Sequence, residues 1–181
     1  FNGYHTELIK RFNPKNITMI EPNYRAAKWL KKEYPECHVI IDDAILYLCD
    51  KPYVKKPYDV VICCGVLYHL HSPVFLLELI ANICQAEYVI LETMDSRNNE
   101  QKDPLSLPVN FLPENDNTPG NRYTSIGFDK TAKLNLNVQL PLFELVMQRL
   151  DYHLIDKVKY YDLGIKHSSK EFVCLSIFKK I

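Results

Sequence analysis

The sequence predicts an α/β fold whose doubly wound, mostly parallel sheet ends in an antiparallel pair of strands. Three observations predict this fold. Short apolar segments alternate with amphipathic segments of helical periodicity as far as Thr93. The segment 58–64 is rich in β-branched residues and lacks alternation, which is typical of a strand buried on both faces. The apolar segments 152–161 and 172–178 are separated by a short polar connection, which favours an antiparallel pair.

The first helices and strands follow from apolar spacing and from residues that begin or end helices. A helix is expected over 4–12, and Asn13-Pro14 ends it. A short strand over 17–20 precedes a helix that continues to about Tyr34, with Pro22 at the first helical position. The residues expected to face inward from these two helices are Leu8, Ile9, Phe12, Ala27, Leu30 and Tyr34.

The next elements continue the alternation of strands and helices. Strands are expected over 38–41 and 88–92, with a short helix over 44–49. A longer helix is expected over 73–84, capped by Ser72-Pro73. The residues expected to face inward from the longer helix are Phe75, Leu76, Leu79, Ile80 and Ile83.

The second half of the chain has a different pattern. Residues 95–137 show little periodicity and contain several prolines, so we expect an ordered loop that acts as a lid. A helix over 140–150 returns before the two final strands. We therefore divide a single domain into a half with alternating elements, 1–94, a lid, 95–137, and a helix with the terminal strand pair, 138–181.

Composition narrows the class of protein. The chain has 181 residues, 22 basic and 22 acidic, and a formal net charge of zero. This balance argues against binding nucleic acid by bulk electrostatics, although a local basic patch is compatible with it. No apolar run approaches the roughly 18 residues of a membrane-spanning helix. The six cysteines lack CxxC spacing, which predicts reduced, buried thiols in a cytoplasmic protein. The His and Cys positions lack the ligand spacing of a zinc site, and we expect no metal.

Candidate functional residues follow the strands, because ligands of open parallel sheets lie at the carboxyl ends of the strands. Glu21 follows the strand over 17–20 and can accept hydrogen bonds from both hydroxyls of a ribose, or it can stabilise a helix start. Asp42 and Asp43 follow the next strand; one carboxylate can accept an adenine amino hydrogen while the other caps the short helix. Gly65 would let a ligand approach the backbone closely.

The block from Tyr58 to Pro73, with the later segment Tyr88 to Thr93, closely resembles the fourth and fifth strands of Rossmann-like S-adenosylmethionine-dependent methyltransferases. Within that superfamily the arrangement GVLYH…SP…LET is most similar to tRNA wobble-uridine methyltransferases and carboxymethyltransferases. The stretch RYT…LPL, which begins at Arg122, is similar to that group's RYA…IPS. The resemblance covers nearly the whole chain; it is specific for the superfamily and much weaker for the substrate.

The resemblance implies S-adenosylmethionine as cofactor, S-adenosylhomocysteine as product, and residues 1–94 as the cofactor-binding half. Glu21 would bind the ribose, and Asp42 or Asp43 the adenine edge with Ala44 beside it. The other implied site residues are Cys64, Gly65 and Tyr68 at the methionine end, with Tyr68 nearest the transferred group, and Arg122 and Tyr123 reaching the substrate or the transferred group from the lid. A surface position is the alternative for Arg122.

The beginning of the chain also fits this resemblance. Phe1 to His5 resembles the last part of the glycine-rich turn GxFDGY, with Asn2 where aspartate is common. Gly3 would let the methionine part of the cofactor pass close to the backbone. The first strand of the fold is missing from this sequence, so we expect the chain to be part of a longer protein, since omitting a central strand exposes unpaired edges.

Methyl transfer from a sulfonium needs alignment of the acceptor more than acid–base help. Tyr68 and His69 are the catalytic candidates; His69 is either a general base or a structural residue that shapes its loop. The acceptor would be a hydroxyl, amine or carboxyl group on a small molecule or a tRNA base. The alternatives are a wobble-uridine carboxymethyltransferase-like enzyme, a cofactor-binding protein without turnover and, less favoured, a nicotinamide dehydrogenase.

Overall fold

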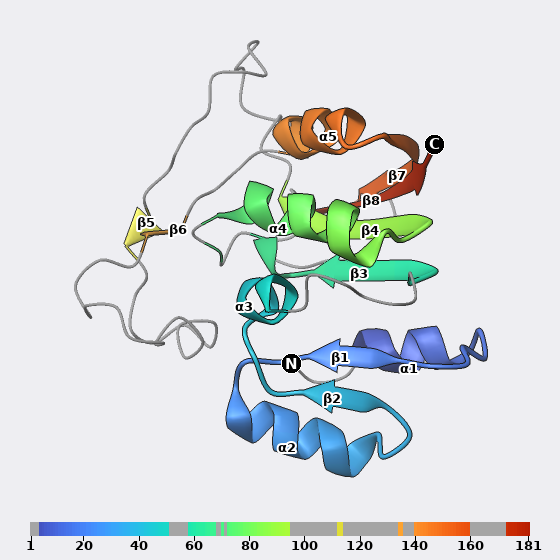
Figure 1. Cartoon of the computed structure of the whole chain (residues 1–181), viewed down its shortest axis with the longest axis vertical. Coiled ribbons are helices and arrows are strands. Elements are labelled where there is room, and N and C mark those ends of the chain that lie inside the picture. Colours follow the sequence, from blue (N-terminus) through green and yellow to red (C-terminus); the bar gives the residue numbers. More distant parts are fainter. Residues whose placement is uncertain are drawn as a thin grey trace. The chain divides into compact units, whose positions relative to one another are not determined.

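A computed structural model (Figure 1) describes residues 4–50, 58–67, 70, 72–94, 112–113, 134–135, 140–159 and 173–181. The chain divides into two compact units, Phe1–Pro52 and Tyr53–Ile181. Each unit contains its own sheet. In the part of the chain that the structure describes, no helix has the length and apolar character needed to cross a bilayer.

The first unit alternates helices with two parallel strands. Its elements in chain order are α1 (Tyr4–Lys10), β1 (Thr18–Ile20), α2 (Tyr24–Glu33), β2 (His38–Ile40) and α3 (Ala44–Cys49). β1 and β2 pair in parallel, with Ile20 opposite Ile40 at their carboxyl ends. These elements match the sequence prediction closely, because an asparagine or an acidic residue that favours a turn or a helix start lies within two residues of each strand end.

The core of the first unit lies between α2 and β2. Ala27, Leu30 and Tyr34 are buried as predicted, and they cluster with Val39 of β2. Two predictions for this unit are wrong. Pro22 does not begin α2; Asn23 is the N-cap, and its side chain accepts a hydrogen bond from the Ala26 amide at 3.0 Å. Phe12 does not face inward: α1 ends at Lys10, and Phe12 beyond it is 85% exposed.

The second unit is built around a four-stranded sheet. Its principal elements are β3 (Val60–Cys64), α4 (Pro73–Leu79), the π-helix η2 (Ile80–Cys84), β4 (Tyr88–Met94), α5 (Leu140–Arg149), β7 (Tyr152–Lys159) and β8 (Val173–Lys180). The strand order is β3-β4-β8-β7. β3 and β4 are parallel, whereas β8 is antiparallel to both β4 and β7. The mixed sheet therefore confirms the predicted terminal antiparallel pair. Two short strands, β5 (Leu112–Pro113) and β6 (Leu134–Asn135), pair antiparallel with each other outside this sheet.

Helices α4 and α5 and the sheet supply the core of the second unit. Leu77, Phe143 and Met147 are almost completely buried, as are Leu91 of β4 and Phe178 of β8. The core also contains polar connections. The buried hydroxyl of Tyr152 donates a hydrogen bond to the Ala86 carbonyl at 2.7 Å, which joins the start of β7 to the segment before β4. Burial raises the pKa of this tyrosine, so it remains a donor at neutral pH.

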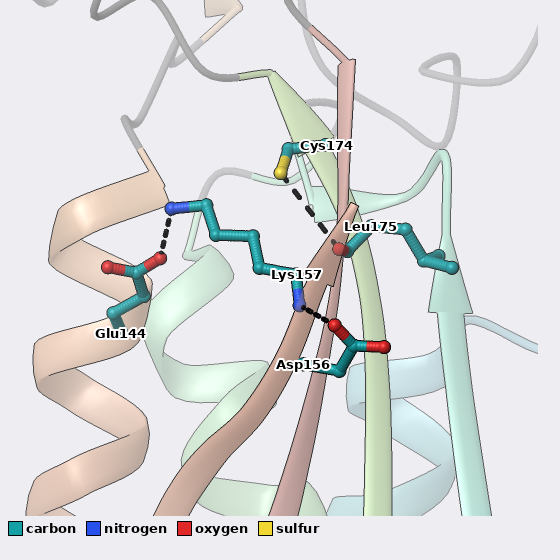
Figure 2. Close-up of polar contacts among 5 residues, drawn as sticks. All are labelled: Glu144, Asp156, Lys157, Cys174 and Leu175. Carbon is teal, nitrogen blue, oxygen red and sulfur yellow. Dashed lines mark hydrogen bonds and ion pairs between the residues drawn. The ribbon is translucent and has the colours of Figure 1, made fainter. Parts of the chain in front are cut away.

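A second connection joins α5 to β7. The ammonium group of Lys157 lies 2.5 Å from a carboxylate oxygen of Glu144, and Figure 2 shows the lysine reaching across to the helix. The Lys157 amide also donates to the side chain of Asp156 at 2.7 Å. The pairing of β7 with β8 shifts between Leu154 and Asp156, so Ile155 forms a bulge and is 53% exposed. Such a bulge protects an edge strand against pairing with other chains.

Three predictions for the second unit are wrong in detail. β3 is not buried on both faces, because Val60 is 44% exposed and Cys63 alone among its five residues is buried. Phe75 of α4 is 42% exposed instead of facing inward. Ser72 precedes α4 but makes no side-chain capping hydrogen bond, and the helix changes to π geometry at Ile80. The sequence did not reveal this change, because a single π turn displaces the apolar spacing of the helix by only about one residue.

Candidate functional site

The first unit presents three carboxylates at the carboxyl ends of its two strands; we call Glu21, Asp42 and Asp43 the acidic edge. Glu21 directly follows β1, and Asp42 lies two residues after β2. The Glu21 amide donates a hydrogen bond to the carbonyl of Ile40 at 3.0 Å, which extends the strand pairing by one step. The parallel register therefore brings carboxylates from two different strand ends to the same edge of the sheet.

Glu21 is the most buried charged residue of the acidic edge. It is only 7% exposed, and one carboxylate oxygen accepts a hydrogen bond from the Asn23 amide at 2.8 Å. Asn23, not Glu21, caps α2. Glu21 thus supports the turn that leads into the helix without acting as the cap. A carboxylate held this rigidly can accept hydrogen bonds from two adjacent hydroxyl groups of a ligand.

Asp42 and Asp43 have different local functions. One oxygen of Asp43 accepts hydrogen bonds from the amides of Ile45 at 2.8 Å and Leu46 at 3.2 Å, so Asp43 is the N-cap of α3. Asp42 accepts from the Asp43 amide at 2.8 Å. Ala44 is the first residue of α3 and is partly buried. The predicted cap is thereby assigned to Asp43, which leaves Asp42 as the carboxylate not used by the helix.

The second unit presents a thiol and a glycine at the end of β3. Cys64 is the last residue of the strand and Gly65 follows with a φ of 68°, in the left-handed region that favours glycine. Burial raises the pKa of the Cys64 thiol, and the negative charge of Glu92 raises it further. A protonated thiol is a poor nucleophile, so Cys64 is suited to lining a site and not to attacking a substrate.

Glu92 was not among the candidates that the sequence predicts. It lies opposite Cys64 in the parallel pairing of β3 and β4, and one of its carboxylate oxygens lies within 4.8 Å of the Cys64 sulfur. The rule that found Glu21 takes residues that follow a strand, and it does not select Glu92 because Glu92 lies within β4. The signal was missed because Glu92 falls inside the apolar segment that identifies its strand, two residues before β4 ends at Met94.

Five predicted site residues lie outside the described residues: Gly3, Tyr68, His69, Arg122 and Tyr123. The predicted lid over 95–137 also lies outside them, except for β5 and β6. Their roles stay predictions. The acidic edge belongs to the first unit, and the Cys64–Gly65 strand end belongs to the second.

All six cysteines are free thiols, as predicted. Cys63, Cys84 and Cys174 are buried, and Cys37 and Cys64 are partly buried. Cys49 is exposed, so the prediction that every thiol is buried is wrong for Cys49 and holds only in part for Cys37 and Cys64. Burial raises the pKa of Cys63 to about 12 and that of Cys84 to about 11. These two thiols therefore stay protonated and unreactive at neutral pH.

The fold is that of the Rossmann-like S-adenosylmethionine-dependent methyltransferases. The N-terminal domain of EvdMO1, whose structure has SAH bound, matches with a TM-score of 0.58 over 98% of this chain and 69% of its own, at 16% identity. A TehB-like SAM-dependent methyltransferase from Corynebacterium glutamicum matches with a TM-score of 0.52 over 92% of this chain and 68% of its own, at 12% identity. At such identities the likeness concerns the fold.

Among characterised sequences, the chain is similar to the tRNA U34 carboxymethyltransferase of Nautilia profundicola, with 32% identity over 103 residues. A second protein of that name, from Campylobacter curvus, is 30% identical over 94 residues. The matched segments cover 55% and 51% of this chain, and the chain spans about a third of the length of these relatives, 34% and 32%. No protein-family model matches the chain.

Proposed function

We propose that this protein is an S-adenosylmethionine-dependent methyltransferase. The observation that carries the proposal is the acidic edge: buried Glu21 and half-buried Asp42 lie at the carboxyl ends of two adjacent parallel strands. This is the edge at which nucleotide cofactors bind in open α/β sheets, where an acidic residue selects the ribose hydroxyls. The methyltransferase fold and the two tRNA U34 carboxymethyltransferase relatives support the same conclusion.

The residues present fit the nucleoside part of the cofactor. The buried carboxylate of Glu21 suits the two ribose hydroxyls, because both can donate to one carboxylate. Asp42 suits the adenine amino group, because Asp43 already caps α3. Ala44 would lie beside the ring.

The end of β3 fits the methionine part of the cofactor. Gly65 keeps the backbone free of a Cβ where an approaching ligand would meet it, and Cys64 offers a neutral, poorly reactive surface. Gly3 and Tyr68 complete this part of the proposed site on the resemblance alone. When bound, the cofactor supplies an electrophilic methyl group next to a positively charged sulfur.

The chain's own residues would bind, orient and exclude water. The acidic edge fixes the nucleoside, and Tyr68 bounds the space next to the transferred group. His69 would accept the proton of a hydroxyl or amine acceptor, and Arg122 and Tyr123 would contact the acceptor from the lid. Such positioning accounts for much of the barrier reduction in reactions of this kind.

The acceptor is proposed to be a hydroxyl, amine or carboxyl group on a small molecule or a tRNA base. The relatives' name makes wobble uridine of tRNA the specific alternative, with a carboxymethyl group transferred instead of methyl. A cofactor-binding protein without turnover is the second alternative. The six free thiols favour the reducing environment of the cytoplasm as the place of the reaction.

The test is calorimetric titration with S-adenosylhomocysteine. The Glu21→Gln variant is expected to bind more weakly by about 1–3 kcal/mol, on the order of 10- to 100-fold in Kd, because the amide replaces an acceptor of two hydroxyl hydrogen bonds. Glu33→Gln, at the exposed far end of α2, is the matched control and should leave Kd unchanged. Equal affinity of Glu21→Gln and the unaltered protein would refute the ribose role. No binding by the unaltered protein would refute the methyltransferase and the cofactor-binding alternatives together.

A further inference from the structure

Helix α2 has an unusual concentration of cations on its exposed side. Four of its ten residues are basic and exposed: Arg25, Lys28, Lys31 and Lys32. At ~100° per residue, all four fall within about 120° of the helix circumference, on the side away from the buried Leu30. In a chain with as many acids as bases, this is a local positive stripe.

The charges of this stripe are not neutralised within the described part of the chain. None of the four cations forms an ion pair with another described residue, whereas Lys10 nearby is paired with Glu36 at 2.8 Å. Glu33 is the single acid of the helix and lies at the margin of the stripe. Arg25 and Lys32 are seven residues apart, about 10 Å along the axis, so the stripe can face several consecutive phosphates of a nucleic acid strand.

Two aromatic rings lie within the same surface. Tyr24 is 56% exposed, and the ammonium of Lys28 lies 4.5 Å from the centre of its ring. Trp29 is 43% exposed; its indole contacts the ring of Tyr34 edge-on, with the ring centres 6.2 Å apart. The edge contact supports Trp29 from one side and leaves much of the indole open to solvent. We call these six residues the α2 stripe: Tyr24, Arg25, Lys28, Trp29, Lys31 and Lys32.

We propose that the α2 stripe is a docking surface for RNA, in which the cations contact phosphates and the two rings stack on unpaired bases. Cations interleaved with aromatic rings are typical of surfaces that bind single-stranded or looped RNA. The same cations could also attract an anionic membrane. However, a membrane-binding helix inserts its apolar side into the lipid, and the apolar side of α2 is buried in the core. This proposal rests on the proposed function, because we choose RNA as the partner from the proposed acceptor on a tRNA base.

The stripe contains its own probe, because Trp29 is the single tryptophan of the chain. Unfractionated bacterial tRNA is expected to quench the fluorescence of Trp29, and S-adenosylhomocysteine alone is expected to leave it nearly unchanged. Quenching by vesicles of anionic phospholipid, without quenching by tRNA, would overturn the choice of RNA as the partner.

Charge reversal measures the contribution of the cations. Lys28→Glu/Lys32→Glu should weaken tRNA binding in a filter assay at least 10-fold and reduce the slope of log K against log salt by about 1.5–2, as expected for two lost phosphate contacts. The matched control is Lys15→Glu/Lys159→Glu, which changes two exposed lysines outside the α2 stripe by the same charge. An equal loss in both double variants would overturn the stripe as a specific surface, as would equal affinity of Lys28→Glu/Lys32→Glu and the unaltered protein.

Titration with S-adenosylhomocysteine separates this proposal from the proposed function. If the unaltered protein binds the cofactor product but not tRNA, the α2 stripe proposal fails and the methyltransferase proposal stands. If the protein binds tRNA through the stripe but does not bind the cofactor product, the α2 stripe proposal stands and the methyltransferase proposal fails. Circular dichroism of both double variants should match that of the unaltered protein, because all four lysines are exposed.

Discussion

The ends of β1 and β2 in the first unit differ in chemistry from the end of β3 in the second unit. In the first unit the strand ends carry carboxylates fixed by neighbouring backbone amides: Glu21 by Asn23, and Asp43 by Ile45 and Leu46. In the second unit the end of β3 offers a neutral thiol and a glycine with positive φ. The first chemistry suits ligand groups that donate hydrogen bonds, and the second leaves the backbone at Gly65 open to close approach.

The units also differ in how they are held together. The acidic edge depends on contacts between residues one to three positions apart, together with a single parallel strand pair. The second unit depends on long-range pairing, since β8 lies between β4 and β7 although it is last in the chain. The contacts that form the acidic edge can therefore be predicted from sequence spacing. The stability of the second unit depends instead on pairing between distant segments.

The largest expected effect comes from weakening that long-range support. Phe143 is 1% exposed in the core of the second unit, so Phe143→Ala should lower the free energy of unfolding by about 3–5 kcal/mol, through lost burial and the cavity left behind. Leu145→Ala on the same helix, at a residue 37% exposed, is the control and should cost less than half as much. Urea unfolding followed by circular dichroism measures both. Similar losses for the two variants would contradict the assignment of the core.

A smaller effect is expected at the neutral strand end. Gly65→Ala should destabilise the protein by about 1–2 kcal/mol, because a Cβ is disfavoured at a φ of 68°. Gly65→Asn should cost less, since asparagine tolerates the left-handed region better. Urea midpoints compared at constant slope test this order. If alanine were tolerated as well as asparagine, the positive φ would not be the reason for glycine here.

The smallest effect separates two neighbours on the acidic edge. Asp43→Ala should lower stability by about 1 kcal/mol through loss of the α3 cap. Asp42→Ala should change stability less and should weaken S-adenosylhomocysteine binding more, because Asp42 is proposed to contact adenine. Thermal unfolding and calorimetry on the same two variants provide the measurements. The reverse pattern would exchange the roles of the two aspartates.

Predictions from the sequence succeeded where a residue's role depends on its neighbours. The helix over 44–49 was predicted with the observed bounds, and Ala27, Leu30 and Tyr34 are buried as their spacing indicates. Predictions failed where burial depends on distant segments. Phe75 has the spacing of a buried residue, but it is 42% exposed. Periodicity indicates which face of a helix is apolar, but it does not indicate how much of that face neighbouring elements cover.

The candidate site divides along the same line. Glu21, Asp42 and Asp43 were identified from their positions after strands, and either aspartate could have capped α3 until hydrogen-bond geometry assigned the cap to Asp43. Glu92 was missed because it lies inside its strand, and its proximity to Cys64 depends on the register between β3 and β4. Register is set by the pairing of whole strands, so the spacing within one strand does not give it.

The sequence by itself determined the alternation of strands and helices, the acidic residues at the strand ends of the first unit, and the antiparallel character of the last two strands. These features follow from local periodicity, caps and turns, which act over a few residues. Only the tertiary structure decided that β8 inserts between β4 and β7 and that Glu92 meets Cys64. It also decided that Tyr24 and Trp29 of α2 stay exposed beside its outward-facing lysines. Each of these depends on which distant segments pack together, and packing is a property of the whole chain.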